Sequence, residues 1–236
     1  LTISATAGFA TGTGKITVIA DVFEEKPPAP QGFLMSKEIY SWTTAASGDE
    51  TITLPTDYDY RMLLIRAYES GTALTSNITK VKMSCDEDKF IPFDLYTDDL
   101  VSLNEEWFGL AQLKQKVYRA DDASPETYIG VIKKAEYYPL ADLHTGHVES
   151  ISADTVTLEL LVLTTSPSIA KETTAQNGEL YAEGIAPHNS LAIPFGIKDN
   201  PATWFPAPSY KSIKLKVTQG DAGAAASVVL QQLRKY

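Results

Sequence analysis

Histidines and acidic runs are the residues of this sequence whose types and spacing could support chemistry. In "HTGHVE" (144–149), His144, His147 and Glu149 could offer two nitrogens and one oxygen to a metal ion. Their spacing alone is not that of a known zinc motif, and no cluster of Cys or His completes the shell. We interpret the segment as a solvated turn between strands. The third histidine, His188, follows a proline in "APHNS", which is a turn signal.

Two acidic segments, "SCDEDK" (84–89) and "YTDDL" (96–100), raise the question of calcium, which takes several carboxylate and carbonyl oxygens. Neither segment has the EF-hand pattern, with glycine at the sixth position and glutamate at the twelfth. Acidic turns on an acidic protein are usually solvated. We therefore assign no metal site and expect no cofactor.

No catalytic motif is recognisable. "GFATGTGKI" (8–16) is similar to a phosphate-binding loop, but Phe9 and Ile16 replace the required Gly and Ser or Thr, and a strand follows. A Gly-x-Ser-x-Gly nucleophile elbow is absent, and Cys85 has no histidine near it in sequence, so we expect a buried strand thiol. No pair of acids stands out for glycoside hydrolysis. The sequence thus predicts a protein that is not an enzyme.

Aromatic pairs are the remaining candidates for binding. They are Trp107 with Phe108, Tyr137 with Tyr138, and Trp204 with Phe205. If exposed, such rings could stack on sugars or anchor a protein partner. We favour the other interpretation for the two Trp–Phe pairs, in which they close the open ends of β-sandwiches.

Composition and charge limit the function further. The chain has 236 residues, 44% of them hydrophobic and 21% charged, with a net charge of −10 and one cysteine. This balance argues against a nucleic-acid-binding surface, and the single cysteine excludes an internal disulfide. No apolar run approaches the roughly 20 residues that span a bilayer. No signal peptide is recognisable, and because the chain starts at Leu1 we expect residues upstream of it.

Short runs of β-branched and aromatic residues, separated by Gly, Pro, Asn and Asp, predict many strands and few helices. Alternation places Val156, Leu158, Leu160 and Val162 on one face, and does the same for Ile16 to Val22. One helix is expected in "TDDLVSLNEEWFG" (97–109), with Thr97 as N-cap and Gly109 as its end. The predicted strands are 14–24, 33–43, 49–54, 61–68, 77–84, 112–119, 127–134, 148–152, 154–164, 179–185, 190–195, 211–218 and 226–235.

One strand motif occurs twice. "YRMLLIRAYESG" (60–71) and "YKSIKLKVTQGD" (210–221) match without a gap at an offset of 150 residues, and other segments match at nearly the same offset. Chance similarity of alternating strands is one explanation, and duplication is the one we favour. The prediction is an all-β chain of two tandem jelly-roll sandwiches, 1–104 and 105–236, with a short connecting helix. The first jelly roll is expected to lack N-terminal strands.

Several phrases together resemble the double jelly-roll major capsid proteins of tailless icosahedral phages and related viruses. They are "LMSKEIYSW", "LPTDYDYRMLLIRAYESG", "ITKVKMSCDEDKFIPFDL", "LAIPFG", "WF" and "SVVLQQLRKY". The resemblance implies two upright jelly rolls, a homotrimer with a pseudo-hexameric outline, and self-assembly of such capsomers into an icosahedral virion shell. It implies no catalytic residue. The chain is short for two complete rolls, and the shortfall lies at the N-terminus.

The resemblance also implies partners and a location. The partners would be further copies of the chain in neighbouring capsomers, penton or minor capsid proteins, and an internal viral membrane, without direct contact to nucleic acid. The protein would be found in the virion, and in the host cytoplasm during assembly. Two other functions stay open: a tandem β-sandwich carbohydrate-binding module using Trp42, Trp107, Trp204 or the paired tyrosines, and a β-sandwich enzyme with an unrecognised pair of carboxylates.

Overall fold

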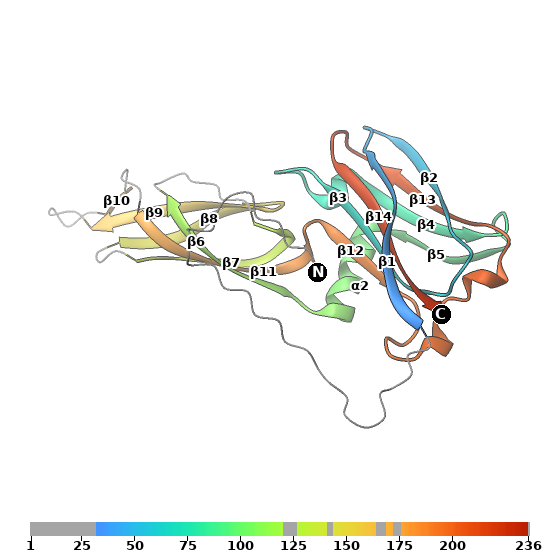
Figure 1. Cartoon of the computed structure of the whole chain (residues 1–236). Helices are drawn as coiled ribbons and strands as arrows, with labels where there is room; N and C mark the ends of the chain where they lie inside the picture. The colour runs from blue at the N-terminus through green and yellow to red at the C-terminus, as the bar shows by residue number, and fades with distance from the viewer. Residues whose placement is uncertain (1–31, 120–126, 141–143, 164–168, 172–175, 236) are drawn as a thin grey trace, which may run out of the picture. The chain divides into compact units, whose positions relative to one another are not determined.

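A computed structural model describes residues 32–119, 127–140, 144–163, 169–171 and 176–235 (Figure 1). Strands dominate this part of the chain, and the helices are few and short. The predicted strand 14–24 and the glycine-containing turn at 8–16 lie outside the described residues.

Eight strands form two four-stranded antiparallel sheets that enclose one core. The first sheet has the order β1-β14-β3-β12 and the second the order β2-β13-β4-β5. Each sheet thus mixes early strands with late ones, and this interleaved order is that of a jelly roll. The bounds are β1 Gly32–Thr43, β2 Gly48–Leu54, β3 Tyr60–Tyr68, β4 Ile78–Cys85, β5 Phe90–Tyr96, β12 Ser190–Pro194, β13 Ile213–Gln219 and β14 Ala225–Lys235.

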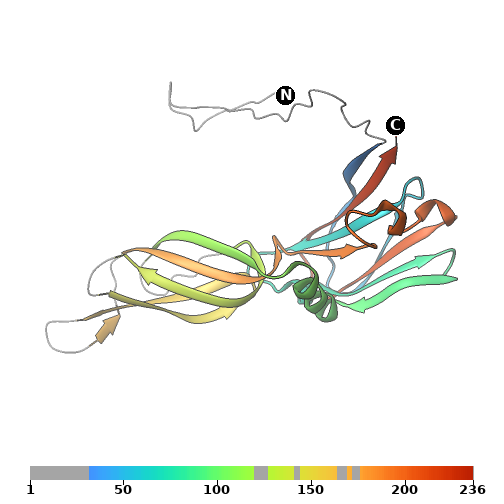
Figure 2. The same cartoon turned by 90° about the horizontal axis from the view of Figure 1, so that it is seen from below.

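Pairing between strands that are far apart in the sequence holds this sandwich together. β1 pairs with β14 from Gly32 opposite Lys235 to Thr43 opposite Ala225, and both views show the two strands side by side (Figures 1 and 2). β13 lies between β2 and β4, and β14 lies between β1 and β3. The four inner strands are therefore β3 and β4, which precede the inserted segment, and β13 and β14, which follow it.

A second sandwich is inserted between β5 and β12. One sheet has the order β6-β11-β7 and the other the order β10-β9-β8. Within the described residues it has two three-stranded sheets, so it is smaller than the eight-stranded jelly roll. The bounds are β6 Ala111–Arg119, β7 Ile129–Pro139, β8 His144–Ser152, β9 Thr155–Leu163, β10 Ile169–Lys171 and β11 Gln176–Pro187.

Strict alternation of buried side chains explains why these segments form strands. In β3, Leu63, Ile65 and Ala67 are buried, and in β13, Ile213, Leu215 and Val217 are buried. A period of two places one set of side chains on the core face of each sheet. In the inserted sandwich, Val156, Leu158 and Leu160 of β9 pack with Leu180 of β11, which confirms the predicted shared face for these three, while Val162 is only partly buried.

Helix α2 (Thr97–Phe108) leads from β5 of the jelly roll to β6 of the insertion. Its existence and its end at Gly109, where φ is 70°, confirm the prediction. The predicted N-cap is wrong by one residue: Tyr96 occupies that position without a side-chain hydrogen bond, and Thr97 is already helical and buried. Asp98 and Asp99 in the first turn interact favourably with the helix dipole.

The buried side chain of Asn104 joins α2 to the open edge of β12. Its Nδ2 donates to the carbonyls of Leu100 (2.8 Å) and Ala192 (3.0 Å). Its Oδ1 accepts from the backbone N–H of Ala192 at 2.8 Å. The amide therefore takes the place of a neighbouring strand, since β12 is an edge strand whose backbone groups would otherwise lack partners.

The predicted division into consecutive halves, 1–104 and 105–236, is wrong. β12, β13 and β14 complete the sandwich that β1 to β5 begin, and the inserted segment forms its own core. The repeat has a different cause from duplication of a whole domain. β3 and β13 are inner strands of the two facing sheets of one sandwich, so both must alternate in the same way to cover one core.

Most strand predictions within the described residues are confirmed, but β5, β10, α1 and the two 3-10 helices Pro201–Thr203 and Ala207–Ser209 were missed. β5 contains Pro92, which argues against an inner strand, but β5 is an edge strand, where proline is tolerated. β10 has only three residues, and α1 (Leu74–Asn77) is one helical turn. None of the described helices is both long enough and apolar enough to cross a bilayer.

Candidate functional site

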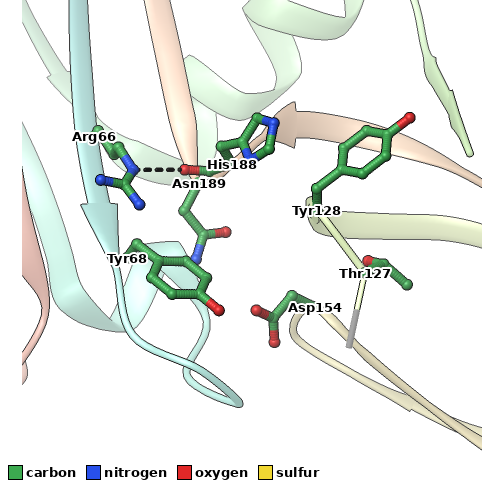
Figure 3. A pocket seen from close by; sticks show the side chains of 7 residues that line it. All are labelled: Arg66, Tyr68, Thr127, Tyr128, Asp154, His188 and Asn189. Atoms are coloured by element: carbon green, nitrogen blue, oxygen red, sulfur yellow. Dashed lines mark hydrogen bonds between the residues drawn. The ribbon is translucent and has the colours of Figure 1, made fainter. Parts of the chain in front are cut away.

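A polar cavity of about 250 Å³ lies where the loops of the jelly roll meet those of the inserted sandwich (Figure 3). Seven side chains line it, from the end of β3, the start of β7, the β8–β9 turn and the β11–β12 turn. Arg66 and Tyr68 come from the jelly roll, and Tyr128 and Asp154 from the insertion. The cavity thus depends on both sandwiches.

Asp154 forms the floor of the cavity from the tight β8–β9 turn. Its side chain is buried, and its Oδ1 accepts the backbone N–H of Gly71 at 3.0 Å and the hydroxyl of Thr155 at 3.3 Å. Its backbone carbonyl accepts the N–H of Thr127 at 2.8 Å. These bonds fix the carboxylate, but its second oxygen, Oδ2, is buried without a hydrogen-bond partner.

Asn189, in the β11–β12 turn, lines the same cavity as Asp154. The turn and the end of β11 are strained, because Ala186 of β11 and His188 and Asn189 of the turn have positive φ, between 53° and 55°. The Asn189 carbonyl accepts the N–H of Ala67 at 3.2 Å, which holds the turn against β3. Its side chain is buried, and neither Oδ1 nor Nδ2 has a hydrogen-bond partner.

The mouth of the cavity is aromatic and basic. The rings of Tyr128 and His188 stack with centroids 5.2 Å apart and an angle of 22° between them. The Tyr128 hydroxyl donates to the Gln112 carbonyl at 2.8 Å, which fixes the ring. Arg66 donates from Nε to the His188 carbonyl at 3.2 Å, as Figure 3 shows.

A second hollow of about 600 Å³ lies on the jelly roll beside the end of α2. Met62, Trp107, Phe108 and Pro194 give it an apolar lining. Trp107 and Phe108 are 40% and 54% exposed, so both place apolar area at the surface. Two cations, Arg61 and Lys198, also line this hollow, which we call the α2 groove.

The β4–β5 turn combines exposed apolar side chains with negative charge, whereas the α2 groove combines them with positive charge. Asp86, Glu87 and Asp88 form the turn, all with positive φ. Phe90 and Ile91 follow at the start of the edge strand β5, and both side chains are exposed. We call residues 86–91 the acidic turn. It presents apolar side chains next to carboxylates.

The predicted histidine cluster lies in a strand and not in a turn, so the interpretation of 144–149 as a turn is wrong. His144, His147 and Glu149 all belong to β8, and His147 Nε2 is 2.8 Å from Glu159 Oε2. His188 does lie in a turn, as predicted, and it forms part of the cavity mouth. In the described part of the chain, no group of three or more His, Cys, Asp and Glu residues is placed to hold a metal ion.

The acidic segments have structural partners. Asp86 Oδ1 accepts the backbone N–H groups of Lys211 (2.8 Å) and Ser212 (3.0 Å), which ties the acidic turn to the segment just before β13. Asp88 pairs with Lys82 at 3.0 Å, which lowers the pKa of the Asp88 carboxyl. Cys85 is buried, as predicted, and burial raises the pKa of its thiol to about 11.

The aromatic pairs have different environments. Trp204 and Phe205 are buried, as expected, and Phe205 stacks on Tyr60 and Tyr210. Trp107 and Phe108 were expected to do the same, but both are exposed at the α2 groove. Burial raises the pKa of the Tyr60 hydroxyl, which donates to the Pro55 carbonyl.

The other aromatic candidates for sugar binding lie away from the polar cavity. Trp42 donates from Nε1 to Gln219 at 3.2 Å and packs partly against the jelly-roll core. Tyr137 is buried in the inserted sandwich, whereas Tyr138 is exposed.

Most residues of the polar cavity were not predicted from the sequence. Asp154 and Asn189 belong to separate turns 35 positions apart in the sequence, and only the topology of the insertion brings them together. The turn signal at "APHNS" was the one indication of this site, and it gave no hint of its partners.

Comparison with known proteins adds one structural neighbour. No known protein family matches the chain, and no curated protein is similar to it in sequence. Among solved structures, the chain is similar to the major capsid protein P2 from bacteriophage PM2, with 10% identity and a TM-score of 0.26. The match covers 86% of this chain and 98% of P2.

Proposed function

We propose that this chain is a structural protein that assembles with copies of itself into a viral shell. The observation that carries the proposal is the pair of complementary surfaces on the jelly roll, the α2 groove and the acidic turn. The first is apolar with Arg61 and Lys198, and the second offers Phe90 and Ile91 beside carboxylates. One copy of the chain therefore has both halves of a contact.

The fold alone leaves the function open. Jelly rolls occur in viral capsids and in lectins, so the choice between these functions depends on the surface and not on the topology. A net charge of −10 makes copies of the chain repel one another unless a specific interface compensates. Placing the acidic turn against Arg61 and Lys198 supplies that compensation, while the aromatic side chains supply apolar area.

The interface is heterologous, because two different surfaces of the jelly roll meet in it. Such contacts close into rings when the rotation between copies allows it. We propose a ring of three chains. Because each chain has two sandwiches, a trimer has six of them, which is the number that a pseudo-hexameric capsomer needs.

Capsomers of this kind would tile a virion shell together with penton or minor capsid proteins, over an internal membrane where the virus has one. The protein would reside in the virion after assembly in the host cytoplasm. In this proposal the chain has no enzymatic activity, and the shell protein does not bind the genome directly.

Charge reversal tests the proposed contact. Changing Lys198→Glu should weaken self-association at least tenfold, since a carboxylate would then face the acidic turn of the next copy. The second change Glu87→Lys should restore much of the association when combined with the first, because it recreates an opposite pair. Analytical ultracentrifugation of the single and double variants measures both effects.

Lys214→Glu is the matched control, because Lys214 is an exposed lysine of β13 outside the α2 groove. It makes the same change in net charge and should alter association much less. Equal weakening by Lys214→Glu and Lys198→Glu, without rescue by Glu87→Lys, would refute this interface.

A further inference from the structure

Two residues that line the polar cavity have buried polar atoms without a hydrogen-bond partner in the protein. Asp154 and Asn189 are each only 1% exposed, and Asp154 Oδ2, Asn189 Oδ1 and Asn189 Nδ2 have no partner. Buried polar groups are almost always paired, because an unpaired one loses its bonds to water without replacement. All three atoms belong to residues that line one cavity, so the unpaired groups lie in its wall.

The shape of the floor depends on a glycine. A Cβ atom added at Gly130 would lie 1.9 Å from Asn189 Oδ1 and 2.9 Å from the Ala186 carbonyl oxygen. The side-chain amide of Asn189 therefore occupies space that only glycine leaves free. Together with the positive φ values of the β11–β12 turn, this places a strained, tightly packed segment at the cavity, as is common at binding sites.

The unused atoms limit the chemistry of the occupant. Two acceptors, on Asp154 and Asn189, require donors from the ligand, and the Asn189 Nδ2 donor requires an acceptor. Hydroxyl groups supply both, because each one donates and accepts. A bare cation would leave the amide donor unused and would share the cavity with the Arg66 guanidinium. An anion would meet the Asp154 carboxylate.

The mouth adds an apolar contact. The half-exposed ring of Tyr128 is held in place by its stack on His188 and by its hydrogen bond to Gln112. A fixed aromatic face suits the C–H face of a sugar ring, while the floor suits the hydroxyl edge. The volume of about 250 Å³ limits the occupant to one ring with its neighbours in solvent.

From these features we propose that the cavity binds one pyranose ring of a glycan, with hydroxyl groups on Asp154 and Asn189 and the ring face on Tyr128. The inference is independent of self-assembly, because the α2 groove and the cavity have no lining residue in common. In a shell protein, such a site would attach the particle to a glycosylated surface.

Saturation-transfer NMR on the whole chain tests the proposal with methyl glycosides of glucose, galactose, mannose, N-acetylglucosamine and N-acetylgalactosamine. We expect one of them to bind with a dissociation constant on the order of 1 mM, as for a single ring. Asp154→Asn should weaken binding at least tenfold while keeping the Oδ1 contact to Gly71. Tyr128→Ala should also weaken it at least tenfold, whereas Tyr128→Phe keeps the ring and should stay within about threefold.

Tyr138→Ala is the matched control for a lost exposed tyrosine, because Tyr138 lies on β7 outside the cavity and should leave binding unchanged. Tyr128 is at the surface, so its variants test the site even if Asp154→Asn fails to fold. Lack of binding to all five glycosides would overturn the proposal. So would binding that Tyr128→Ala leaves intact, or a melting temperature raised by calcium chloride and by none of the sugars.

Discussion

Replacing Asn104 by alanine tests the junction on which the described architecture depends. The side chain makes three hydrogen bonds, of 2.8, 3.0 and 2.8 Å, and two of them satisfy the N–H and C=O of Ala192 on the edge of β12. The change Asn104→Ala leaves both of these backbone groups without a protein partner. It also separates α2 from the strand that follows the insertion.

The size of the effect follows from those bonds. A buried group that loses its partner costs about 1–3 kcal/mol, and two groups are affected here. The better helix propensity of alanine offsets about 0.5 kcal/mol of this loss in the free energy of unfolding. We therefore expect a loss of about 1.5–5.5 kcal/mol in the free energy of unfolding, which corresponds to roughly 3–22 °C in Tm for a chain of this size.

Urea unfolding followed by hydrogen exchange at the Ala192 amide measures both consequences. Ser102→Ala is the control, because Ser102 is exposed on the same helix and bonds only to Asp98 of that helix. It should change stability by less than about 0.5 kcal/mol. If Asn104→Ala changed stability no more than Ser102→Ala and left exchange at Ala192 unaltered, the assigned role of Asn104 would be refuted.

Three further results are expected. Because burial raises the pKa of Cys85 to about 11, the thiol of the unfolded chain ionises first as the pH rises, so the free energy of unfolding should fall between about pH 8.5 and pH 11, and less so in Cys85→Ala. A thiol reagent at about pH 8 should react with Cys85 only after unfolding. Rapid labelling of the native chain would contradict the burial of this thiol. Gly130→Ala should destabilise the chain by at least about 2 kcal/mol in thermal unfolding, because the new methyl group meets Asn189, whereas Gly71→Ala adds a methyl group with nothing within 4 Å and should cost only its backbone strain. Replacing residues 112–183 by about four Gly and Ser residues should leave a folded jelly roll by circular dichroism, since Ala111 and Gly184 are paired neighbours; an unfolded product would contradict the insertion.

The local structure was predictable to a large extent because strand periodicity is a local signal. The alternation in β3, β9 and β13 predicted strands, and burial of one face followed in each of them. The end of α2 was also predictable, since Gly109 adopts the positive φ that other residues avoid. β5, which was missed, contains Pro92, and a strand with proline is tolerated at a sheet edge, a position that the sequence does not reveal.

The arrangement of the strands was not predictable in the same way. The match between residues 60–71 and 210–221 is real, but strands of facing sheets and strands of duplicated domains produce the same alternation. Only long-range pairing separates these cases, and pairing leaves no local trace in a single sequence. The polar cavity shares this limit, because Asp154 and Asn189 meet only through the fold.

The most direct test of the central claim is the native mass of the full chain in solution, measured by size exclusion with light scattering and followed by electron microscopy of the same sample. The proposed self-assembly predicts a species of three chains of 25.7 kDa each, with a pseudo-hexagonal outline in projection. A monomer that persists at concentrations well above 100 μM, where even a weak specific interface should be populated, would contradict self-assembly as the function of this protein.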